Sequence, residues 1–302
     1  MVLVVGSSNV DYVFKVDHFT REGETQRAES FQLHPGGKGA NQAVTVGKLK
    51  GESLFLSCLS ENDGQVLIKN FMRWNVKGWK VCGEYTGKAF IEVTKEGKNR
   101  IIIYPGANSF LTPEVVNQNK KIIENSDIVL LQNEIPLDGN KKAVDIAKRL
   151  GKYVILDPAP AQNLDKDILT LVDLITPNEE EAKVIGEFFG CEFENPESFV
   201  KCMVTSGVKA VIVKLGENGS IYYDGKNLIK VDAFKVENVV DTTAAGDVYN
   251  GALATALDEG KSMEEAMVFA SAASAISVTR MGAQSSIPQR KEVDAFLKNQ
   301  KM

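Results

Sequence analysis

Hydrophobic positions along the chain fall into two alternating kinds of segment, short β-branched runs and longer stretches with one apolar side. The short runs have the length and composition of buried strands, and they lie at residues 3–6, 53–59, 128–132, 153–160, 174–178 and 210–216. The amphipathic stretches predict helices at residues 39–51, 63–75, 140–150, about 247–280 and after Pro288. Strands that alternate with helices are typical of a mostly parallel sheet with helices on both faces, so we predict a three-layer α/β/α sandwich.

Two segments depart from this rhythm, residues 10–33 and 88–104. Both alternate apolar and polar residues around turn sequences such as REGE and KEGKN, which predicts β-ribbons outside the parallel sheet. We expect the ribbons to form one small sheet that covers a cleft. Their apolar residues, for example Val13, Phe31 and Ile102, exceed what a lid over a small ligand needs, which favours a partner subunit against them. The alternative is a hairpin that packs only on its own domain.

Composition and charge narrow the class of protein. The 302 residues are 43% hydrophobic and 25% charged, and we expect one large domain over residues 1–302 with the ribbons inserted in it. The net charge of −5, without a block of Lys and Arg, argues against nucleic acid as a partner. The N-terminal apolar run is too short for a signal peptide and no later run reaches membrane-spanning length, so we expect a cytoplasmic protein.

The cysteines give no sign of a cross-link or a metal site. Cys58, Cys82, Cys191 and Cys202 are scattered without a CxxC pair, and the chain has only two histidines. This pattern suggests neither a zinc site nor a disulfide framework. We therefore expect four buried free thiols, which pack like small hydrophobic side chains.

The sequence DTTAAGD, residues 241–247, places small residues in front of the helix expected to begin near Asp247. The amides of Ala244, Ala245 and Gly246 would lie at the positive end of the helix dipole, where unpaired backbone N–H groups bind anions such as phosphate. An aspartate beside an anion is costly unless it takes a proton from a hydroxyl that attacks the phosphate, which makes Asp247 a candidate general base. The alternative is a helix cap, and we expect Asp247 to occupy a capping position in either case.

A second glycine-rich run, HPGGKGANQA, opens the helix at residues 39–51. It fits neither the Walker nor the GxGxxG pattern, since Gly39 follows Lys38, and a nucleotide phosphate loop is therefore disfavoured. The glycines would let the backbone approach a ligand, while Lys38 and Asn41 offer polar groups that suit a polyhydroxylated substrate. The alternative is a helix start whose glycines serve only the backbone geometry.

Polar side chains also follow two of the expected strands. Asn9 and Asp11 come after the first strand, and Glu134 comes after the strand at residues 128–132. Ligands of open α/β folds bind at this edge of the sheet, and an aspartate there can accept hydrogen bonds from two neighbouring hydroxyls. Each of these residues alone is weak evidence, because carboxylates in loops are usually only solvated.

Two further segments could serve a nucleotide. Asn178 and Glu181 lie three residues apart at a helix start, where their oxygens could hold the water shell of a magnesium ion, although acidic residues are common in any first helical turn. The turn from Gly216 to Gly219 could lie against a nucleotide or form an ordinary hairpin.

Together these motifs resemble the ribokinase branch of the PfkB carbohydrate kinase family over nearly the whole chain. The most specific are GGKGANQA, DPAPA, TPNEEEA, DTTAAGD and VTRMGAQSSIP, and their order and spacing argue against a chance likeness. The resemblance implies a ribokinase-like sandwich with a β-sheet lid that also makes a homodimer contact. It implies ATP-dependent phosphorylation of D-ribose at its 5-hydroxyl, with magnesium and potassium as cofactors.

The resemblance also assigns roles to positions. Asp247 becomes the catalytic base, and the anion hole for the transferred phosphoryl group falls to Ala244, Ala245 and Gly246. The sugar falls to Asn9, Asp11, Gly37, Lys38, Asn41, Glu134 and Asp247. ATP and its magnesium fall to Asn178, Glu181, Lys214, Leu215, Gly216, Glu217, Asn218, Gly219, Gly246 and Ser271. Potassium falls to Asp241, Thr243, Ser277, Arg280, Gly282 and Ser286, several of them through backbone carbonyls.

Two positions depart from the family pattern. Lys214 stands where a small hydroxyl residue is usual, and Asp157 replaces the asparagine of an NPAPA motif. Lys214 is able to contact phosphate or to turn outward. Another sugar or nucleoside of the family, of the deoxyribose, fructose or adenosine type, remains an alternative substrate. A catalytically silent sugar-binding protein is the alternative class, and Asp247 beside TTAAG argues against it.

Overall fold

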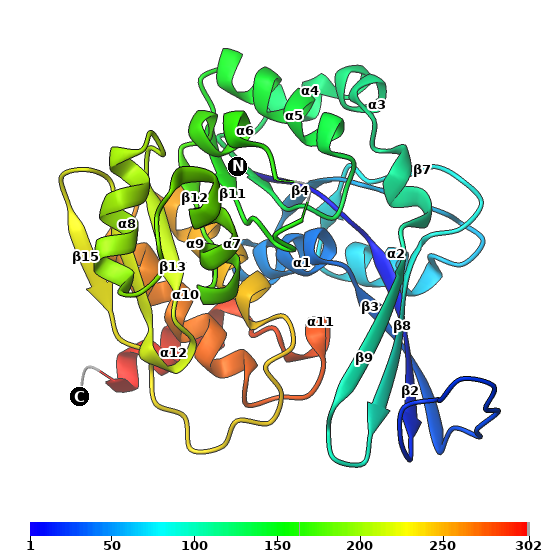
Figure 1. Cartoon of the computed structure of the whole chain (residues 1–302). Helices are drawn as coiled ribbons and strands as arrows, with labels where there is room; N and C mark the ends of the chain where they lie inside the picture. The colour runs from blue at the N-terminus through cyan, green and yellow to red at the C-terminus, as the bar shows by residue number, and fades with distance from the viewer. Residues whose placement is uncertain (163, 301–302) are drawn as a thin grey trace.

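The structure is a computed structural model, and it describes residues 1–162 and 164–300. Within these residues a central sheet has nine strands in the order β15-β14-β13-β12-β11-β10-β1-β4-β6 (Figure 1). The strands that run parallel are β1 (Val2–Val5), β4 (Ser53–Leu56), β6 (Val76–Lys77), β10 (Ile128–Leu131), β11 (Tyr153–Leu156), β12 (Leu174–Ile175) and β13 (Val211–Lys214). At one end β14 (Ser220–Tyr223) and β15 (Leu228–Val231) are antiparallel. The predicted, mostly parallel sheet is confirmed.

Helices cover both faces of this sheet. One layer consists of α1 (Lys38–Lys50), α2 (Gln65–Arg73), α9 (Ala245–Asp258), α10 (Met263–Ser277) and α12 (Arg290–Gln300). The other consists of α3 (Pro113–Gln118), α4 (Lys120–Glu124), α5 (Leu137–Arg149), α6 (Lys166–Leu171), α7 (Glu179–Phe189) and α8 (Pro196–Thr205). Short elements complete the chain, namely α11 (Ala283–Ser286), β5 (Cys58–Leu59), β7 (Lys80–Val81) and the 3₁₀ turns η1 (Gly106–Phe110) and η2 (Gly216–Asn218).

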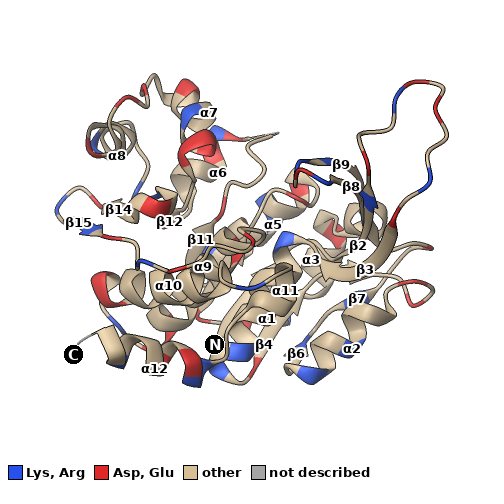
Figure 2. Cartoon of the chain, turned by 90° about the horizontal axis from the view of Figure 1, so that it is seen from below, with Lys and Arg blue, Asp and Glu red and all other residues tan. Residues whose placement is uncertain are grey.

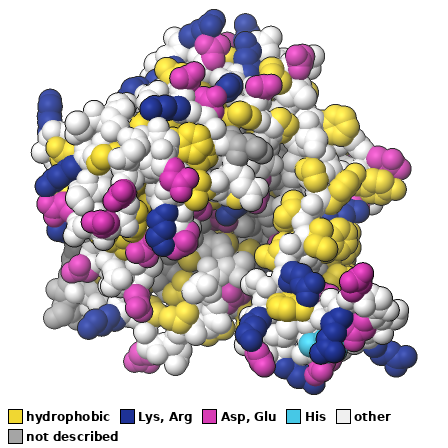
Figure 3. Space-filling model, in the orientation of Figure 1, with side chains coloured by type: hydrophobic (Ala, Val, Ile, Leu, Met, Phe, Trp, Pro, Cys, Tyr) yellow, Lys and Arg dark blue, Asp and Glu magenta, His cyan; other side chains and the backbone are white. Residues whose placement is uncertain are grey.

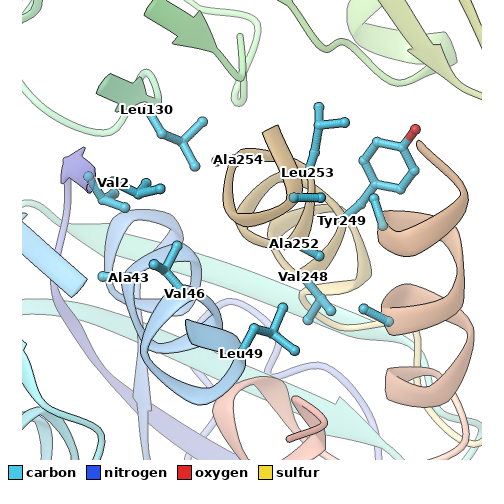
Figure 4. Close-up of a cluster of buried hydrophobic side chains, with 14 of the residues drawn as sticks. Val2, Ala43, Val46, Leu49, Leu130, Val248, Tyr249, Ala252, Leu253 and Ala254 are labelled. Carbon is cyan, nitrogen blue, oxygen red and sulfur yellow. The ribbon is translucent and has the colours of Figure 1, made fainter. Parts of the chain in front are cut away.

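The two hydrophobic cores explain why the strands are continuous apolar runs. Val2 and Val4 of β1 belong to the core shared with α1 and α9, whereas Leu3 and Val5 belong to the core on the other face. Every position of such a strand is buried, as is usual for a parallel sheet between two helical layers. Figure 4 shows side chains of α1 directed toward those of α9, which fixes the relative position of the two helices that begin at the glycine-rich motifs.

A separate small sheet, which we call the lid, projects from the sandwich (Figure 1). Among the described residues it has four strands in the order β3 (Ser30–Gly36), β2 (Asn9–Val16), β8 (Gly87–Thr94) and β9 (Asn99–Tyr104). The two predicted ribbons are joined because β2 and β8 pair in parallel. The predicted small sheet is thus confirmed, but the first ribbon is not continuous, since residues 17–29 form a loop. The polar sequence of this loop has no apolar side to bury, and its side chains instead bond one another, as His18 does with Glu24.

The prediction of four free thiols is wrong for two of them. Cys191, just after α7, and Cys202, in α8, form a disulfide, whereas Cys58 and Cys82 are the free cysteines of the described residues. The chain turns back between α7 and α8 and brings the two Cα atoms to 5.8 Å, which is within the range that a disulfide spans. The separation of 11 residues between the two cysteines in the sequence does not indicate this turn.

Seen from below, the positions of Lys and Arg and those of Asp and Glu are distributed over many elements of the described chain (Figure 2). None of the helices in the described part of the chain has the length and apolar character needed to cross a membrane.

Candidate active site

A cavity of about 980 Å³ opens beside the carboxyl ends of the parallel strands. It is lined by the start of α1, the segment after β11, the start of α7, the turn after β13 and the first turn of α9. These elements are far apart in the sequence, yet they meet because they all follow or face neighbouring strands. Of the predicted site residues, the cavity brings together Lys38, Asn178, Glu181, Lys214, Gly216, Glu217, Asn218, Gly219, Ala244, Ala245, Gly246, Asp247 and Ser271.

Helix α9 begins two residues earlier than predicted. Ala245 is its first residue, and Ala244 is the N-cap, in the left-handed conformation with φ of 62°. Asp247 therefore lies inside the first turn, and its predicted position as a cap is wrong. Its carboxylate instead accepts hydrogen bonds from Asn41 Nδ2 at 2.9 Å and Gln42 Nε2 at 3.1 Å. Because α1 packs against α9, it presents these two side-chain amides to the Asp247 carboxylate. The carboxylate bonds them and not the backbone N–H groups of its own helix.

The first turn of α9 also leaves backbone donors unpaired. Ala245 N–H donates to the carbonyl of Thr242 at 3.2 Å, but in the described residues the amides of Ala244 and Gly246 have no backbone acceptor. A Cβ placed on Gly246 would meet, among described atoms within 4 Å, only Lys214 Nζ at 3.5 Å. Free N–H groups at the positive end of a helix, with space in front of them, form a site for an anion such as phosphate.

The environment of Asp247 suits proton transfer near neutral pH. The side chain is buried, and burial raises its pKa to about 6, although the nearby Lys38 ammonium lowers it. Burial lowers the pKa of Lys38, but the carboxylates of Asp247, Asp157 and Glu134 outweigh that effect and raise it well above its usual range. A carboxylate with a pKa near the working pH can accept a proton and remain mostly charged beforehand.

Residues predicted for the sugar lie around the start of α1. Asn41, in α1, donates to Asp247 directly, and Glu134 Oε2 accepts from the backbone N–H of Lys38 at 3.0 Å. Gly37 is the N-cap of α1, with φ of 88°, and a Cβ there would meet the backbone of Asn9 at 2.7 Å. The glycine-rich run thus allows α1 to begin directly against the segment that joins β1 to β2.

Asp11, on β2 of the lid, is a second carboxylate with a shifted proton affinity. Burial raises its pKa to about 7, and the charges of Glu134 and Asp247 add to the shift. The carboxylates of Asp11 and Asp247 therefore belong to one electrostatic site, although the two residues come from the lid and from α9.

Sequence reasoning missed two residues whose side chains hold predicted sugar-binding residues in place, Ser7 and Asn108. Ser7 Oγ donates to Glu134 at 2.6 Å, and Asn108 Nδ2 donates to Asn9 Oδ1 at 2.8 Å.

Asn178 and Glu181 bind each other at the start of α7. Asn178 Oδ1 accepts from the N–H of Glu181, and Glu181 Oε2 accepts from the N–H of Asn178, both at 2.8 Å. This reciprocal cap uses one oxygen of each side chain. Burial raises the pKa of Glu181, whose side chain also lines the cavity.

Among the described residues no group of three or more His, Cys, Asp and Glu side chains is arranged around a metal position. A magnesium ion here would therefore depend on phosphates and water for most of its ligands.

The residues predicted for potassium lie on two segments that are tied together. Asp241 Oδ1 accepts from the N–H and hydroxyl of Thr243, and Asp241 Oδ2 accepts from the N–H of Gly282 at 2.8 Å. The hydroxyls of Ser277 and Ser286 donate to backbone carbonyls within their own helices, and Arg280 pairs with Glu292. These side chains already make hydrogen bonds, and an ion at this place would be held by backbone carbonyls, by the remaining lone pairs of Asp241 and by hydroxyl oxygens, which keep their lone pairs when they donate.

A buried amide connects the catalytic region to the position of the DPAPA motif. Gln42 Nε2 donates to Asp247 Oδ1 and also to Asp157 Oδ2 at 2.9 Å, while Gln132 donates to the oxygen of the Gln42 amide. Gln42 is fully buried. Sequence reasoning missed it, and the available signal was a long polar side chain between Ala40, Ala43 and Val44 on the apolar side of the helix.

Comparisons with known proteins agree with this geometry. A family model described as pfkB family carbohydrate kinase matches residues 1–290. The ribokinase of Haemophilus influenzae is 43% identical over 304 residues, and the match covers 98% of each chain. The solved ribokinase of Thermotoga maritima is 50% identical with a TM-score of 0.93 over 99% of each chain. The ribokinase of Arabidopsis thaliana, solved with ribose and ATP, is 36% identical with a TM-score of 0.91 over 98% of each chain.

Proposed function

The chain belongs to the pfkB family of carbohydrate kinases, and on that premise we propose that it transfers the γ-phosphoryl group of ATP to the 5-hydroxyl of D-ribose. The products are ribose 5-phosphate and ADP, and residues 1–302 act as one kinase domain. One observation carries the proposal. Asp247 is a buried carboxylate with the free amides of Ala244 and Gly246 on the same helical turn and with the polar residues of α1 against it. The similarity to ribokinases over almost the whole chain supports ribose as the sugar.

The sugar binds between the lid and α1 in this proposal. Its hydroxyls are bound by Asn9, Asp11, Gly37, Lys38, Asn41 and Glu134, a set in which the carboxylates accept hydrogen bonds, the ammonium donates them and the Asn amides do both. Asn41 also fixes the Asp247 carboxylate, so the residue that holds the sugar and the residue that activates it are directly bonded. Closure of the lid over the sugar excludes water, which would otherwise accept the phosphoryl group.

The chemistry is a proton transfer coupled to phosphoryl transfer. Asp247 takes the proton of the 5-hydroxyl as the oxygen attacks the γ-phosphorus and the bond to the β-phosphate oxygen breaks, which leaves ADP. The backbone N–H groups at the start of α9 stabilise the charge on the transferred phosphoryl group. Asn41 and Gln42 keep the carboxylate in place for the attack, because each bonds a different oxygen of it.

ATP occupies the cavity between α7, α9 and α10, against the turn from Lys214 through Leu215 to Gly219 and beside Ser271. Magnesium, when bound, neutralises charge on the phosphates, and Asn178 and Glu181 would hold its water shell. Potassium would be held beside the anion site by Asp241, Thr243, Ser277, Arg280, Gly282 and Ser286, mainly through backbone carbonyls. The chain of hydrogen bonds between Asp241, Thr243 and Gly282 already orders the segment in front of α9.

A homodimer through the lid completes the proposal. The register of the described lid strands places four residues side by side in one row, namely Leu33, Tyr12, Phe90 and Ile102. This row lies on the face of the lid opposite to Asp11, because successive residues of a strand point to opposite faces. Phe31, on the same face, is half exposed, and Ile102 is 65% exposed. Figure 3 shows hydrophobic side chains gathered over this part of the molecule. A second copy covering this apolar row would remove it from water.

A panel of substrates tests the activity. The purified chain is incubated with ATP, magnesium and potassium and with ribose, deoxyribose, fructose or adenosine in turn, and phosphorylated product is measured. We expect ribose to give the highest kcat/KM. A higher value for another member of the panel would replace ribose in the proposal. Sugar binding without any turnover would instead favour a silent binding protein.

A further inference from the structure

The two departures from the family pattern contact each other. Lys214 Nζ lies 3.0 Å from Asp157 Oδ1, and the two side chains are 13% and 2% exposed. The residues are far apart in sequence, but β11 and β13 are both next to β12, so the segments that follow them share one edge of the sheet. Both residues line the cavity that we assign to the nucleotide. Lys214 therefore turns inward, which the sequence left open.

The ammonium of Lys214 lies over the anion site of α9. Its Nζ is 3.5 Å from the position that a Cβ on Gly246 would occupy, beside the free amide of that residue. Asp157 is held on its other side by Gln42, whose amide also binds Asp247. The buried amide of Gln42 thus connects the Asp157 carboxylate of the ion pair to the carboxylate of Asp247, the proposed general base.

Charge explains why the two residues occur together. A lone carboxylate at position 157 would be buried close to Asp247 and would repel the phosphates of a nucleotide. Removing one partner of a buried ion pair leaves an uncompensated charge, which costs far more than the intact pair. Lysine at position 214 neutralises that carboxylate. Its ammonium has three donors, of which Asp157 Oδ1 accepts one.

We propose that Lys214 binds a non-bridging oxygen of the terminal phosphate of ATP, and that Asp157 is a positioning residue that keeps the ammonium over the anion site. The inference rests on the proposed use of ATP. Among the described residues two other lysines line the cavity, Lys38 and Lys235, and neither has a carboxylate oxygen within 4 Å, so Lys214 is held differently from both. Lys38 is surrounded by the charges of Asp247, Asp157, Glu134 and Glu181, whereas Lys214 is fixed by one short contact.

Nucleotide binding without sugar tests the proposal without turnover. The affinities of ADP and of an ATP analogue with an imido group between its β- and γ-phosphates are measured by calorimetry, with magnesium present. Lys214→Met is expected to weaken the analogue about tenfold more than ADP, because only the analogue has the phosphate that Lys214 contacts. Equal losses for both nucleotides, or no loss, would overturn the proposal.

The double variant separates a phosphate contact from a purely structural ion pair. Asp157→Asn together with Lys214→Met removes both charges and leaves no orphaned carboxylate. We expect it to bind the analogue better than Lys214→Met alone but still about tenfold more weakly than the unchanged chain. Full recovery of the affinity would mean that Lys214 serves only to neutralise Asp157, and would contradict the proposal.

A matched control pair lies outside the cavity. Lys148 pairs with Asp173 in the layer of α5, and both side chains are partly buried. Lys148→Met is expected to leave the affinities for both nucleotides unchanged, and a loss there equal to that of Lys214→Met would overturn the assignment of the contact. Failure of the unchanged chain to bind the analogue would instead count against the proposed use of ATP, so the two failures are distinguishable.

Discussion

Asp247 carries a charge that its surroundings oppose, since burial and the carboxylate of Asp157 both raise its pKa. A residue needed only to begin a helix would not be placed in this way, and the structure confirms that it caps nothing. Two amide donors and the Lys38 ammonium nearby offset part of the cost. We interpret this arrangement as a base that is held charged and oriented before the substrate arrives.

Asp247→Asn separates catalysis from binding. We expect kcat to fall by at least about 100-fold while ribose still binds, because the amide keeps the shape of the side chain but cannot take the proton. Steady-state kinetics and calorimetry with ribose measure the two effects.

The stability of the Asp247→Asn variant is the control. The folded-state pKa of Asp247 is raised, so the residue destabilises the fold as pH rises through about 6. The variant should melt at a temperature no lower than that of the unchanged chain at pH 8. Turnover near that of the unchanged chain would remove the base from the account.

The pH dependence of kcat/KM for ribose reports Asp11 and Asp247 together. Both act as carboxylates, and their raised pKa values are about 7 and about 6. As pH falls, Asp11 gains a proton first, so kcat/KM should decline below pH of about 7 and more steeply below about 6. In Asp11→Asn the break near pH of about 7 should disappear from the kcat/KM profile, and the KM for ribose should rise. A flat profile from about pH 5 to about pH 8 in the unchanged chain would contradict both assignments.

At the scale of the element, two glycines of α9 should respond in opposite ways to the same substitution. A Cβ on Gly246 would make only an ordinary van der Waals contact, with Lys214 Nζ at 3.5 Å, so Gly246→Ala should keep the melting temperature while its methyl group enters the anion site and lowers kcat. Gly251 packs on α1, where a Cβ would meet Thr45 at 2.7 Å, so Gly251→Ala should lower the melting temperature. Thermal melts and kinetics of both variants measure this. Normal turnover in a well-folded Gly246→Ala would show that phosphate does not approach the first turn.

Elements were easier to predict from the sequence than the contacts between them. Apolar runs located the lid and the parallel strands except the two-residue β6, because burial on one or both faces fixes the periodicity of a strand. The start of α9 was misplaced by two residues, since Ala244 adopts a left-handed conformation that local sequence does not favour for alanine. Gln42 and the Cys191–Cys202 disulfide were missed because each depends on packing between elements that only the folded chain brings together.

At the scale of the whole molecule, the lid would link the proposed sugar binding to the proposed dimer. One face carries Asp11, and the opposite face carries the apolar row through Phe90 and Ile102. In a dimer formed by this row, the position of each lid would depend on the partner subunit. The proposed association would therefore order the same strand that presents Asp11 to the sugar.

Ile102→Lys tests this association. The substitution places a charge at the β9 end of the apolar row, on a side chain that is 65% exposed, so we expect a species of 33.0 kDa where the unchanged chain sediments at twice that mass. Met72→Lys is the control, because Met72 is 74% exposed but lies on α2 and not on the lid. Analytical ultracentrifugation of the three proteins gives the answer. A dimer that survives Ile102→Lys, or an unchanged chain that is monomeric, would refute the contact.

The most direct test of the central claim is the fate of the γ-phosphoryl group. Phosphorus NMR of the unchanged chain with equal amounts of ATP and D-ribose, with magnesium and potassium present, follows every phosphate in one sample. The account predicts that one ribose 5-phosphate forms for each ADP and that no inorganic phosphate appears. Release of inorganic phosphate without sugar phosphate, or phosphate on a different hydroxyl of ribose, would contradict it.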